Sequence, residues 1–458
     1  MKHLDPSRKS EVDGDFVIPP YYRESPEMRK QCSRIYNSIS LTDQQFEGIL
    51  RDLEEDGLRD STIIFCFSDH GEGMPRAKGS ALGSGHRVPF ILWIPDMYRD
   101  LSPWGSGVIT DELVSFEDFG ATVLSLAGVE IPTYNEGVPF LPKQELKGRS
   151  SKKKYVFGAC DAVDNNIELA RTVTDGHYMY SRIFTNYQPF VRWTPYYDHS
   201  RIQKIMREDY SEDRLNPLQR AILDPREMEY LYDIENDKWE SINLAQSTKH
   251  KGVIRRMRKA LMKYLTESRD AHFIPEYTLS KYHLKELPYD MRLDDEFYPF
   301  DRILAAASLI GLGSEAIPEQ LNALNDENDF VSYWAAIALF TQRGGFTTSQ
   351  LEGLKESLDK LSYPPTKVWA AAAILNVEEY QPARTVIDEA ILGSDDQLAA
   401  TAFNALLEIK LEVANSFIST FHDMEKSHEL MKRTSASSHY LVVKQRVEGV
   451  EFSYEQYW

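Results

Sequence analysis

The sequence is poor in cysteine, in positive charge and in long apolar runs. Its three cysteines, Cys32, Cys66 and Cys160, are too few for a disulfide framework, and their spacing is unlike that of a metal-binding knuckle. Lys and Arg number 52 against 71 Asp and Glu, which leaves a net charge of -19. Such a surface repels phosphate backbones and anionic lipids, so we expect neither a nucleic acid nor a membrane as partner. No stretch approaches the roughly 20 consecutive apolar residues that a membrane-spanning helix needs.

The first residues also lack the apolar core of a signal peptide. Together with the low cysteine content, which fits a reducing compartment, this predicts a chain that stays in the cytoplasm as written.

The composition is that of a globular protein with several domains. The 458 residues are 42% hydrophobic and 27% charged, and at about 150 residues per domain they suggest two to four units. Residues 26–57 predict a long helix with a capping serine, a proline at its first position and a glycine at its end. The apolar runs 63–67 and 88–94 are typical of strands buried on both faces, and another helix is expected at 115–127. Strands that alternate with helices predict an α/β layer structure with a mostly parallel sheet.

A different pattern follows. Short β-like pieces at 155–159, 171–173 and 177–184, separated by turn residues, predict a small antiparallel sheet. A basic amphipathic helix is expected at about 250–267. Residues 270–300 are rich in Tyr, Pro and acids and have no period, which predicts a linker packed on a surface.

Between 301 and about 410, alanine-rich helical segments recur roughly every 30 to 35 residues. These segments are 305–309, 334–339, 369–374 and 399–403. Because small residues permit close helix contact, each unit is expected to be a helical hairpin stacked on the next, similar to short HEAT repeats.

The patterns divide the chain into five expected parts. They are an α/β domain at 1–150, an antiparallel α+β subdomain at 151–270, a linker at 271–300, α-helical HEAT-like repeats at 301–410 and an unassigned tail at 411–458.

The residues that carry chemistry follow the first apolar run, in Ser68-Asp69-His70-Gly71-Glu72. The end of a strand is where open α/β sheets place ligands, and a carboxylate beside an imidazole supplies two donors for a divalent cation. The alternative is a strand-ending turn in which Asp69 caps a helix. Two donors cannot close a metal shell of about six oxygens, so both interpretations stay open at this point.

Three pieces in order then resemble a known family. They are Ser68-Asp69-His70-Gly71 with Lys78 shortly after it, the run Gly85-His86-Arg87-Val88-Pro89-Phe90, and the late stretch Glu229 to Leu244. From about Pro19 to Leu244 the chain resembles the C-terminal half of a sulfatase of the alkaline-phosphatase superfamily. The resemblance implies a truncated alkaline-phosphatase-like fold.

The resemblance also implies roles for single residues. Asp69 and His70 match positions that ligate calcium or magnesium, and Lys78 matches the basic residue that contacts the sulfate and the leaving oxygen. A cation and an ammonium group would stabilise the charge that grows on a sulfate ester in transit. Arg76 and Arg87 are candidate substrate-binding residues. The alternatives are a solvated loop lysine for Lys78 and loop-bracing roles for both arginines.

His86 lies between these motifs at a position where the family pattern is not fixed. We interpret it as a surface or packing histidine rather than as a catalytic residue.

The family nucleophile is missing from this sequence. It lies in Cys-x-Pro-Ser-Arg or Ser-x-Pro-Ser-Arg and is oxidised to formylglycine, whereas Leu4-Asp5-Pro6-Ser7-Arg8 places a leucine there. The paired aspartates of the family's first strand are absent as well. We expect a chain that is inactive alone and needs a complementary N-terminal half. An uncovered sheet edge also predicts low solubility or instability.

Three functions are compatible with these features. The first is a metal-dependent hydrolase of sulfuric esters that acts on a sulfated small molecule or polysaccharide. The second is a phosphodiesterase or phosphoethanolamine transferase of the same superfamily. The third is a non-catalytic remnant whose helical repeats bind a protein or polymer. Relatives are commonly exported or lysosomal, so the resemblance and the N-terminus leave localisation open.

Overall fold

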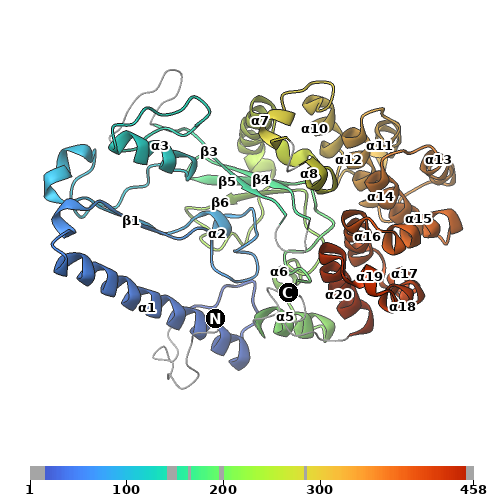
Figure 1. Cartoon of the computed structure of the whole chain (residues 1–458). Coiled ribbons are helices and arrows are strands. Elements are labelled where there is room, and N and C mark those ends of the chain that lie inside the picture. The colour runs from blue at the N-terminus through green and yellow to red at the C-terminus, as the bar shows by residue number, and fades with distance from the viewer. Residues whose placement is uncertain (1–15, 142–151, 163–166, 195–200, 283–285, 450–458) are drawn as a thin grey trace.

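The computed structural model of the chain describes residues 16–141, 152–162, 167–194, 201–282 and 286–449. Within them the elements follow one another along an elongated molecule (Figure 1). A long helix and a two-stranded ribbon form the N-terminal end, a four-stranded sheet lies in the middle, and stacked helices form the other end. The segment Leu4–Arg8 lies outside the described residues.

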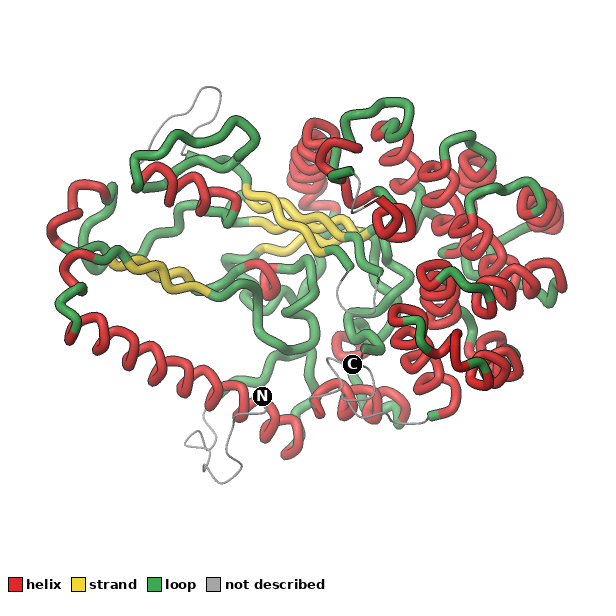
Figure 2. Tube along the Cα trace, in the orientation of Figure 1, coloured by secondary structure: helices red, strands yellow, loops and turns green. Residues whose placement is uncertain are grey.

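Figure 2 shows the same division by type of element, with strands confined to two places and helices dominating the C-terminal half. The strands are β1 (Ile64–Phe67), β2 (Phe90–Trp93), β3 (Val156–Cys160), β4 (Ala170–Thr174), β5 (Tyr178–Ile183) and β6 (Glu229–Asp233). The helices before residue 300 are α1 (Pro26–Glu55), α2 (Gly83–His86), α3 (Glu117–Leu126), α5 (Arg201–Ser211), α6 (Pro217–Arg220), α7 (Lys251–Ser268), α8 (Glu276–Tyr282) and α9 (Pro288–Met291). The later helices are α10 (Phe300–Ser308), α11 (Ile317–Leu324), α12 (Asp329–Phe340), α13 (Thr348–Leu358), α14 (Pro364–Leu375), α15 (Gln381–Leu392), α16 (Asp396–Glu408), α17 (Leu411–Asn415), α18 (Ile418–Lys426), α19 (His428–Met431) and α20 (Thr434–Glu448).

Helix α1 begins where the sequence predicts. The hydroxyl of Ser25 accepts a hydrogen bond from the backbone N–H of Met28 at 3.1 Å, and Pro26 occupies the first turn. The chain leaves the helix through Gly57, whose φ of 69° favours glycine. The helix expected at 26–57 is therefore confirmed.

The two apolar runs pair in the opposite sense to the predicted one. Strands β1 and β2 are antiparallel, with Ile64 opposite Trp93 and Phe67 opposite Phe90, so the parallel sheet predicted for this region is wrong. An apolar run indicates burial but not strand direction, and the segment between the strands holds only the short helix α2 instead of a full crossover helix.

These strands are also not buried on both faces. One face meets α3, where Phe65 and Phe119 lie 5.0 Å apart, but on the other face Ile91 and Trp93 are 62% and 43% exposed. The α/β character of this end is real, but its sheet is small and antiparallel.

Strands β3 to β6 form the expected antiparallel sheet in the order β3-β4-β5-β6. Its faces pack against different parts of the chain. Val173 and Tyr180 join the buried side of α7 in the main hydrophobic core. On the other face, the hydroxyls of Thr172 and Ser181 both donate to the carbonyl of Ala81 at 2.6 Å. The sheet therefore separates α7 from the loop that precedes α2.

The C-terminal half is an array of antiparallel helices (Figures 1 and 2). Helix α12 packs between α10 and α14, and α14 packs in turn against α16, while α11, α13 and α15 form a second row. The stretch 370–373 of α14 consists of buried alanines, which lets neighbouring helices approach closely. None of the described helices is both long and apolar enough to cross a membrane.

The sheet and the helical array share one core. Residues 271–300, expected to form a linker, contain α8 and α9 and bury Phe273 and Tyr298 completely. Arg182 of β5 donates to the carbonyls of Ser308 and Ile310, both at 3.0 Å, and so caps the C-terminal end of α10. After residue 410, the chain forms α17 to α20, and α20 packs against α16.

Candidate active-site loop

The loop after β1 has a fixed shape because one of its glycines has no room for a side chain. The backbone N–H of Gly71 donates to the carbonyl of Gly85 at 3.0 Å, and a Cβ on Gly71 would lie 1.9 Å from a backbone oxygen of α2. The Ser68 hydroxyl donates to the His70 carbonyl at 2.7 Å, and the His70 N–H donates to Asp69 Oδ1 at 3.0 Å. These contacts place Asp69 and His70 directly beyond the strand.

The side chains of Asp69 and His70 meet on the outside of this loop. His70 Nε2 lies 3.4 Å from Asp69 Oδ2, and the two side chains are 41% and 82% exposed. His70 Nδ1 lies 2.8 Å from the carbonyl oxygen of Gly71. A proton on Nδ1 that is donated to this oxygen leaves the lone pair on Nε2, an arrangement common among metal-bound histidines.

A carboxylate and such an imidazole fit a divalent cation in kind. They fall short in number, because across the described residues no group of three or more His, Cys, Asp or Glu side chains could hold a metal ion. A complete shell here would need further donors.

Lys78 returns to the same turn through its backbone. Its N–H donates to the carbonyl of Glu72 at 2.9 Å, and the N–H of Met74 donates to the same oxygen at 2.7 Å. The structure therefore brings the backbone of Lys78 beside the Asp69–Glu72 turn, and its side chain is partly exposed.

Arg76 points into the protein interior. Its guanidinium donates to the carbonyl of Trp239 at 2.9 Å and to the hydroxyl of Tyr232 at 3.0 Å, contacts the carbonyl of Glu240, and lies 4.7 Å from the ring of Tyr21. Arg76 is 4% exposed and its φ is 70°. These contacts give Arg76 the loop-bracing role that the sequence left open.

The carboxylate of Glu240 completes this clamp. It accepts hydrogen bonds from the backbone N–H groups of Gly83 at 2.8 Å and Ser84 at 3.2 Å, at the start of α2. Burial raises the pKa of Glu240, while the positive charge of Arg76 opposes the rise. The stretch Glu229 to Leu244 thus belongs to the site region because it holds the loop.

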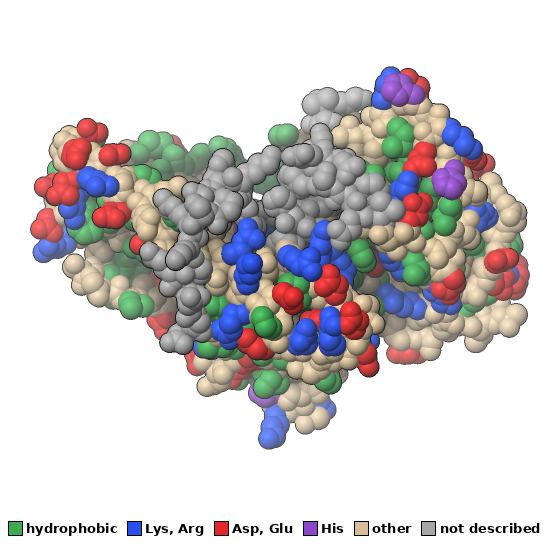
Figure 3. All heavy atoms as spheres, turned by 90° about the horizontal axis from the view of Figure 1, so that it is seen from below, with side chains coloured by type: hydrophobic (Ala, Val, Ile, Leu, Met, Phe, Trp, Pro, Cys, Tyr) green, Lys and Arg blue, Asp and Glu red, His purple; other side chains and the backbone are tan. Residues whose placement is uncertain are grey.

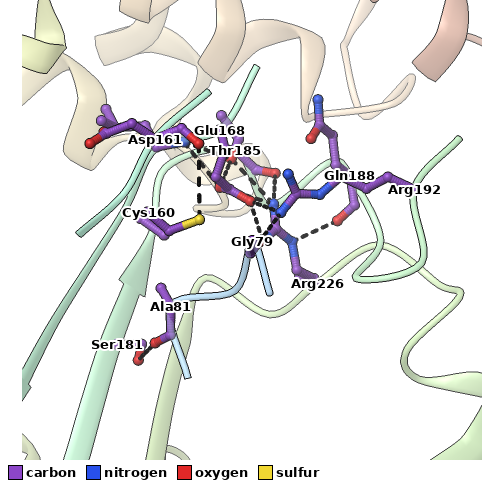
Figure 4. Close-up of polar contacts among 12 residues, drawn as sticks. Gly79, Ala81, Cys160, Asp161, Glu168, Ser181, Thr185, Gln188, Arg192 and Arg226 are labelled. Atoms are coloured by element: carbon purple, nitrogen blue, oxygen red, sulfur yellow. Dashed lines mark hydrogen bonds and ion pairs between the residues drawn. The ribbon is translucent and has the colours of Figure 1, made fainter. Parts of the chain in front are cut away.

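A buried ionic network, absent from the sequence prediction, supports the loop from behind (Figure 4). Glu168 accepts hydrogen bonds from Arg226 at 2.8 Å and from the Thr185 hydroxyl at 2.5 Å, and it also pairs with Arg192. Arg192 donates in addition to the carbonyl of Gly79 at 2.9 Å. Arg192 therefore ties the residue next to Lys78 to a fully buried carboxylate.

Burial alone would raise the pKa of Glu168, but Arg192 and Arg226 outweigh it and hold the pKa below its usual value. The carboxylate is therefore ionised and paired. No motif in the sequence links these positions, which lie far apart along the chain.

Arg87 and His86 differ in exposure. The side chain of Arg87 is exposed between α2 and β2, where it is open to an external group. The ring of His86 packs on Gly158, where a Cβ would come within 2.9 Å of His86 Cε1. Burial, with a smaller effect of Arg171, lowers the pKa of His86 to about 4. This environment agrees with a packing histidine.

Comparison with known proteins points to one family. Residues 9–129, which include Asp69, His70 and Lys78, match the family Sulfatase.

Individual relatives carry the same family name. The chain is 31% identical over 268 residues to an ulvan-active sulfatase of Formosa agariphila, an alignment that covers 58% of this chain and 43% of the relative. It is 24% identical over 250 residues to a delta 4,5-hexuronate-2-O-sulfatase of Bacteroides thetaiotaomicron, covering 53% of this chain and 42% of that protein. The solved structure of a protein with its substrate D-glucosamine-2-N,6-O-disulfate aligns at a TM-score of 0.33 and 15% identity, over 50% of this chain and 39% of the other. The chain thus spans less than half the length of these curated relatives.

Proposed function

We propose that the loop after β1 is the metal-binding and sulfate-binding part of a sulfatase site that hydrolyses sulfuric esters of a carbohydrate. The observation that carries this proposal is the accessible pair of Asp69 and His70, whose side chains meet at 3.4 Å within the segment that matches the family. The names of the relatives, an ulvan-active sulfatase and a delta 4,5-hexuronate-2-O-sulfatase, support a sulfated carbohydrate as the substrate class.

In this proposal each residue of the loop has a distinct task. Asp69 would hold a calcium or magnesium ion through a carboxylate oxygen and His70 through Nε2, and the ion would polarise the ester oxygens. The ammonium group of Lys78 stabilises the negative charge that develops on the leaving oxygen. Arg87, exposed beside β2, adds a positive charge for the sulfate.

In this proposal the nucleophile comes from another polypeptide segment. The 458 residues contain no Cys-x-Pro-Ser-Arg or Ser-x-Pro-Ser-Arg motif from which formylglycine could be made. In this proposal Asp69 and His70 serve as metal ligands, so neither of them is available as the nucleophile. We infer that a complementary segment supplies the nucleophile together with the missing metal donors.

The experiment is reconstitution. This chain would be co-expressed with a sulfatase segment that carries Cys-x-Pro-Ser-Arg and the first-strand aspartates, and hydrolysis of 4-nitrophenyl sulfate would be measured with added calcium. We expect turnover from the pair and none from either part. Lys78→Ala should lower the rate about 10²- to 10³-fold, and Asp69→Asn should abolish the calcium dependence.

Two controls make the result interpretable. Lys360→Ala, at an exposed lysine of the helical half, should leave the rate unchanged. Hydrolysis by this chain alone, above the level of its Lys78→Ala variant, would contradict the assignment of the nucleophile to another segment. An active pair whose rate is insensitive to both Asp69→Asn and Lys78→Ala would contradict the assigned site.

A further inference from the structure

Helix α7 carries a block of positive charge in an otherwise acidic chain. The 15-residue stretch 249–263 contains seven Lys or Arg residues and no Asp or Glu, whereas the whole chain has a net charge of -19. In Figure 1 the helix lies at the top of the molecule, beside the four-stranded sheet. On the face seen from below in Figure 3, positive and negative side chains are intermingled instead.

The helix separates its apolar and its charged side chains. Ile254, Met257, Leu261 and Leu265 are buried in the core against the sheet. All the Lys and Arg side chains between 251 and 263 are exposed. The charged side of α7 therefore faces solvent.

Some of these cations stabilise the fold. Arg256 pairs with Asp175 at 2.7 Å, and Arg258 pairs with Glu229 at 2.6 Å. Lys263 pairs with Glu267 at 2.6 Å. These contacts account for three of the charges.

Lys249 lies in the short helical turn before α7, and the three remaining charges of α7 itself form a stripe. Lys251, Arg255 and Lys259 are spaced four residues apart, so they lie on one side of the helix over about 12 Å. No ion pair joins them to the described residues. We call these three side chains the α7 stripe.

The α7 stripe works against the stability of its own helix. Like charges four residues apart repel each other, and Lys251 adds positive charge at the helix N-terminus, where the helix dipole is already positive. The first turn of α7 contains no acidic residue that would offset this. An exposed arrangement that is locally unfavourable points to a partner that neutralises it.

A further cation from another element extends this surface. The guanidinium of Arg256 donates to the hydroxyl of Tyr155 at 3.2 Å, and Lys154 Nζ lies 5.3 Å from the ring of Tyr155. The positive surface therefore continues from α7 to the start of β3.

We propose that the α7 stripe binds a sulfated polysaccharide. Three cations in a row match a polymer with repeated sulfate groups better than a single small anion, and a partner of this chemistry is the substrate class of the proposed function, on which this inference rests. The nearby rings of Phe157 and Tyr264 stack on each other at 3.9 Å, so one face of each ring is unavailable to a nucleic-acid base.

The position of the stripe defines how it acts. The sheet separates α7 from the loop that leads to α2, since Val173 and Tyr180 face the helix while Thr172 and Ser181 contact Ala81. A polymer on α7 is therefore held away from Asp69 and Lys78. The α7 stripe therefore increases the affinity for long sulfated polysaccharides and does not change the affinity for a sulfated monosaccharide.

The test uses the full chain and heparin, a sulfated polysaccharide, as the probe. The dissociation constant would be measured over a series of salt concentrations for the wild type and for the variant Lys251→Gln/Arg255→Gln/Lys259→Gln. The control variant Lys30→Gln/Lys360→Gln/Lys410→Gln makes the same change in net charge at exposed lysines elsewhere in the chain. We expect the stripe variant to bind about tenfold more weakly, with a salt slope reduced by about two to three units, and the control to change less than about twofold.

Other outcomes would overturn the proposal. Equal weakening in both variants would show an effect of net charge alone, and unchanged binding would exclude the stripe. Tighter binding of duplex DNA than of heparin at equal salt would indicate a nucleic acid instead. The melting temperature of the stripe variant should stay the same or rise, and a fall together with weaker binding would indicate a structural role.

The outcome is separable from that of the reconstitution experiment. Asp69→Asn and Lys78→Ala should leave heparin binding unchanged. Heparin binding through the stripe without any reconstituted hydrolysis would reject only the proposed activity, and the reverse result would reject only the stripe.

Discussion

The two ends of the molecule use the same kind of sequence in opposite ways. The runs 63–67 and 88–94 and the run 334–339 are all continuous stretches of apolar residues. In α12 every residue of 330–340 is buried by neighbouring helices, whereas β1 and β2 leave Phe67, Ile91 and Trp93 exposed. The difference shows that an apolar run favours burial, but that its actual burial depends on which other parts of the chain pack against it.

The uncovered side of β1 and β2 is a defined surface. It forms a hollow together with Phe46 and Leu50 of α1, and Ile91 and Trp93 contribute its apolar wall. The guanidinium of Arg59 lies 5.5 Å from the Trp93 ring. Exposed apolar strands of this kind promote association between chains.

The largest expected difference in stability between the two regions comes from replacing one tryptophan in each of them with alanine. Trp369 of α14 is completely buried against Phe340 and Tyr187, so Trp369→Ala should lower the free energy of unfolding by about 3 to 5 kcal/mol. Trp93→Ala in β2 should cost less than about 1 kcal/mol. Urea unfolding followed by circular dichroism measures both, and similar losses would refute the contrast.

The same contrast should hold for charges. Glu168→Gln leaves Arg192 and Arg226 buried without their anion, and we expect a loss of about 3 kcal/mol in the free energy of unfolding. Glu267→Gln, which breaks the exposed pair with Lys263, should cost no more than about 0.5 kcal/mol. The denaturant midpoints of the two variants measure this difference in stability. A Glu168→Gln variant as stable as the Glu267→Gln variant would contradict a stabilising role for the buried network.

The helical end should respond to pH through one carboxyl. Burial raises the pKa of Glu408 in α16 from 4.5 to about 7, against the opposing charges of Arg446 and Arg343. Because the folded state binds this proton more tightly than the unfolded state, its contribution to stability is complete below about pH 4.5 and is lost as the pH rises to about 7. Melting temperatures over this range should therefore fall more steeply for the wild type than for Glu408→Gln. Parallel curves would exclude a titrating Glu408.

The smallest effect on stability is expected at the N-terminal end. Ile91→Lys places a charge on the exposed face of β2 and should change the free energy of unfolding by less than about 0.5 kcal/mol, yet it should raise solubility. Light scattering at matched concentrations measures the gain. Ile374→Lys, at a fully buried position of α14, is the matched control and should prevent folding. A wild-type chain that is fully soluble and monomeric would remove the basis of this prediction.

Local signals in the sequence predicted much of the fold. The capped helix α1, the small antiparallel sheet and the alanine-rich helices are each specified by neighbouring residues, such as Ser25 with Pro26 or the alanines at 370–373. The antiparallel direction of β1 and β2 could not be predicted. Ile64 pairs with Trp93 across a long separation in sequence, and neither strand contains a local pattern that specifies this pairing. After residue 410, α17 and α19 contain only 5 and 4 residues, which are too few turns to show a period.

The candidate site was likewise predictable only where its residues are close together in the sequence. Asp69, His70 and Lys78 lie within ten residues, so a local motif predicts them together. The contacts that shape the loop join distant positions, namely Arg76 with Glu240 and Arg192 with both Gly79 and Glu168. These residues become neighbours only when the chain folds, and a single sequence contains no local pattern that predicts such contacts.

The cap that Arg182 places on α10 has a consequence for how the helical array can change during evolution. Stacks of helices need an end that differs from the interior, and here the sheet contacts the α10 end of the array through Arg182. Inserting or deleting a hairpin next to α10 would sever these hydrogen bonds. A change in the number of helices at the α20 end would leave both hydrogen bonds from Arg182 in place.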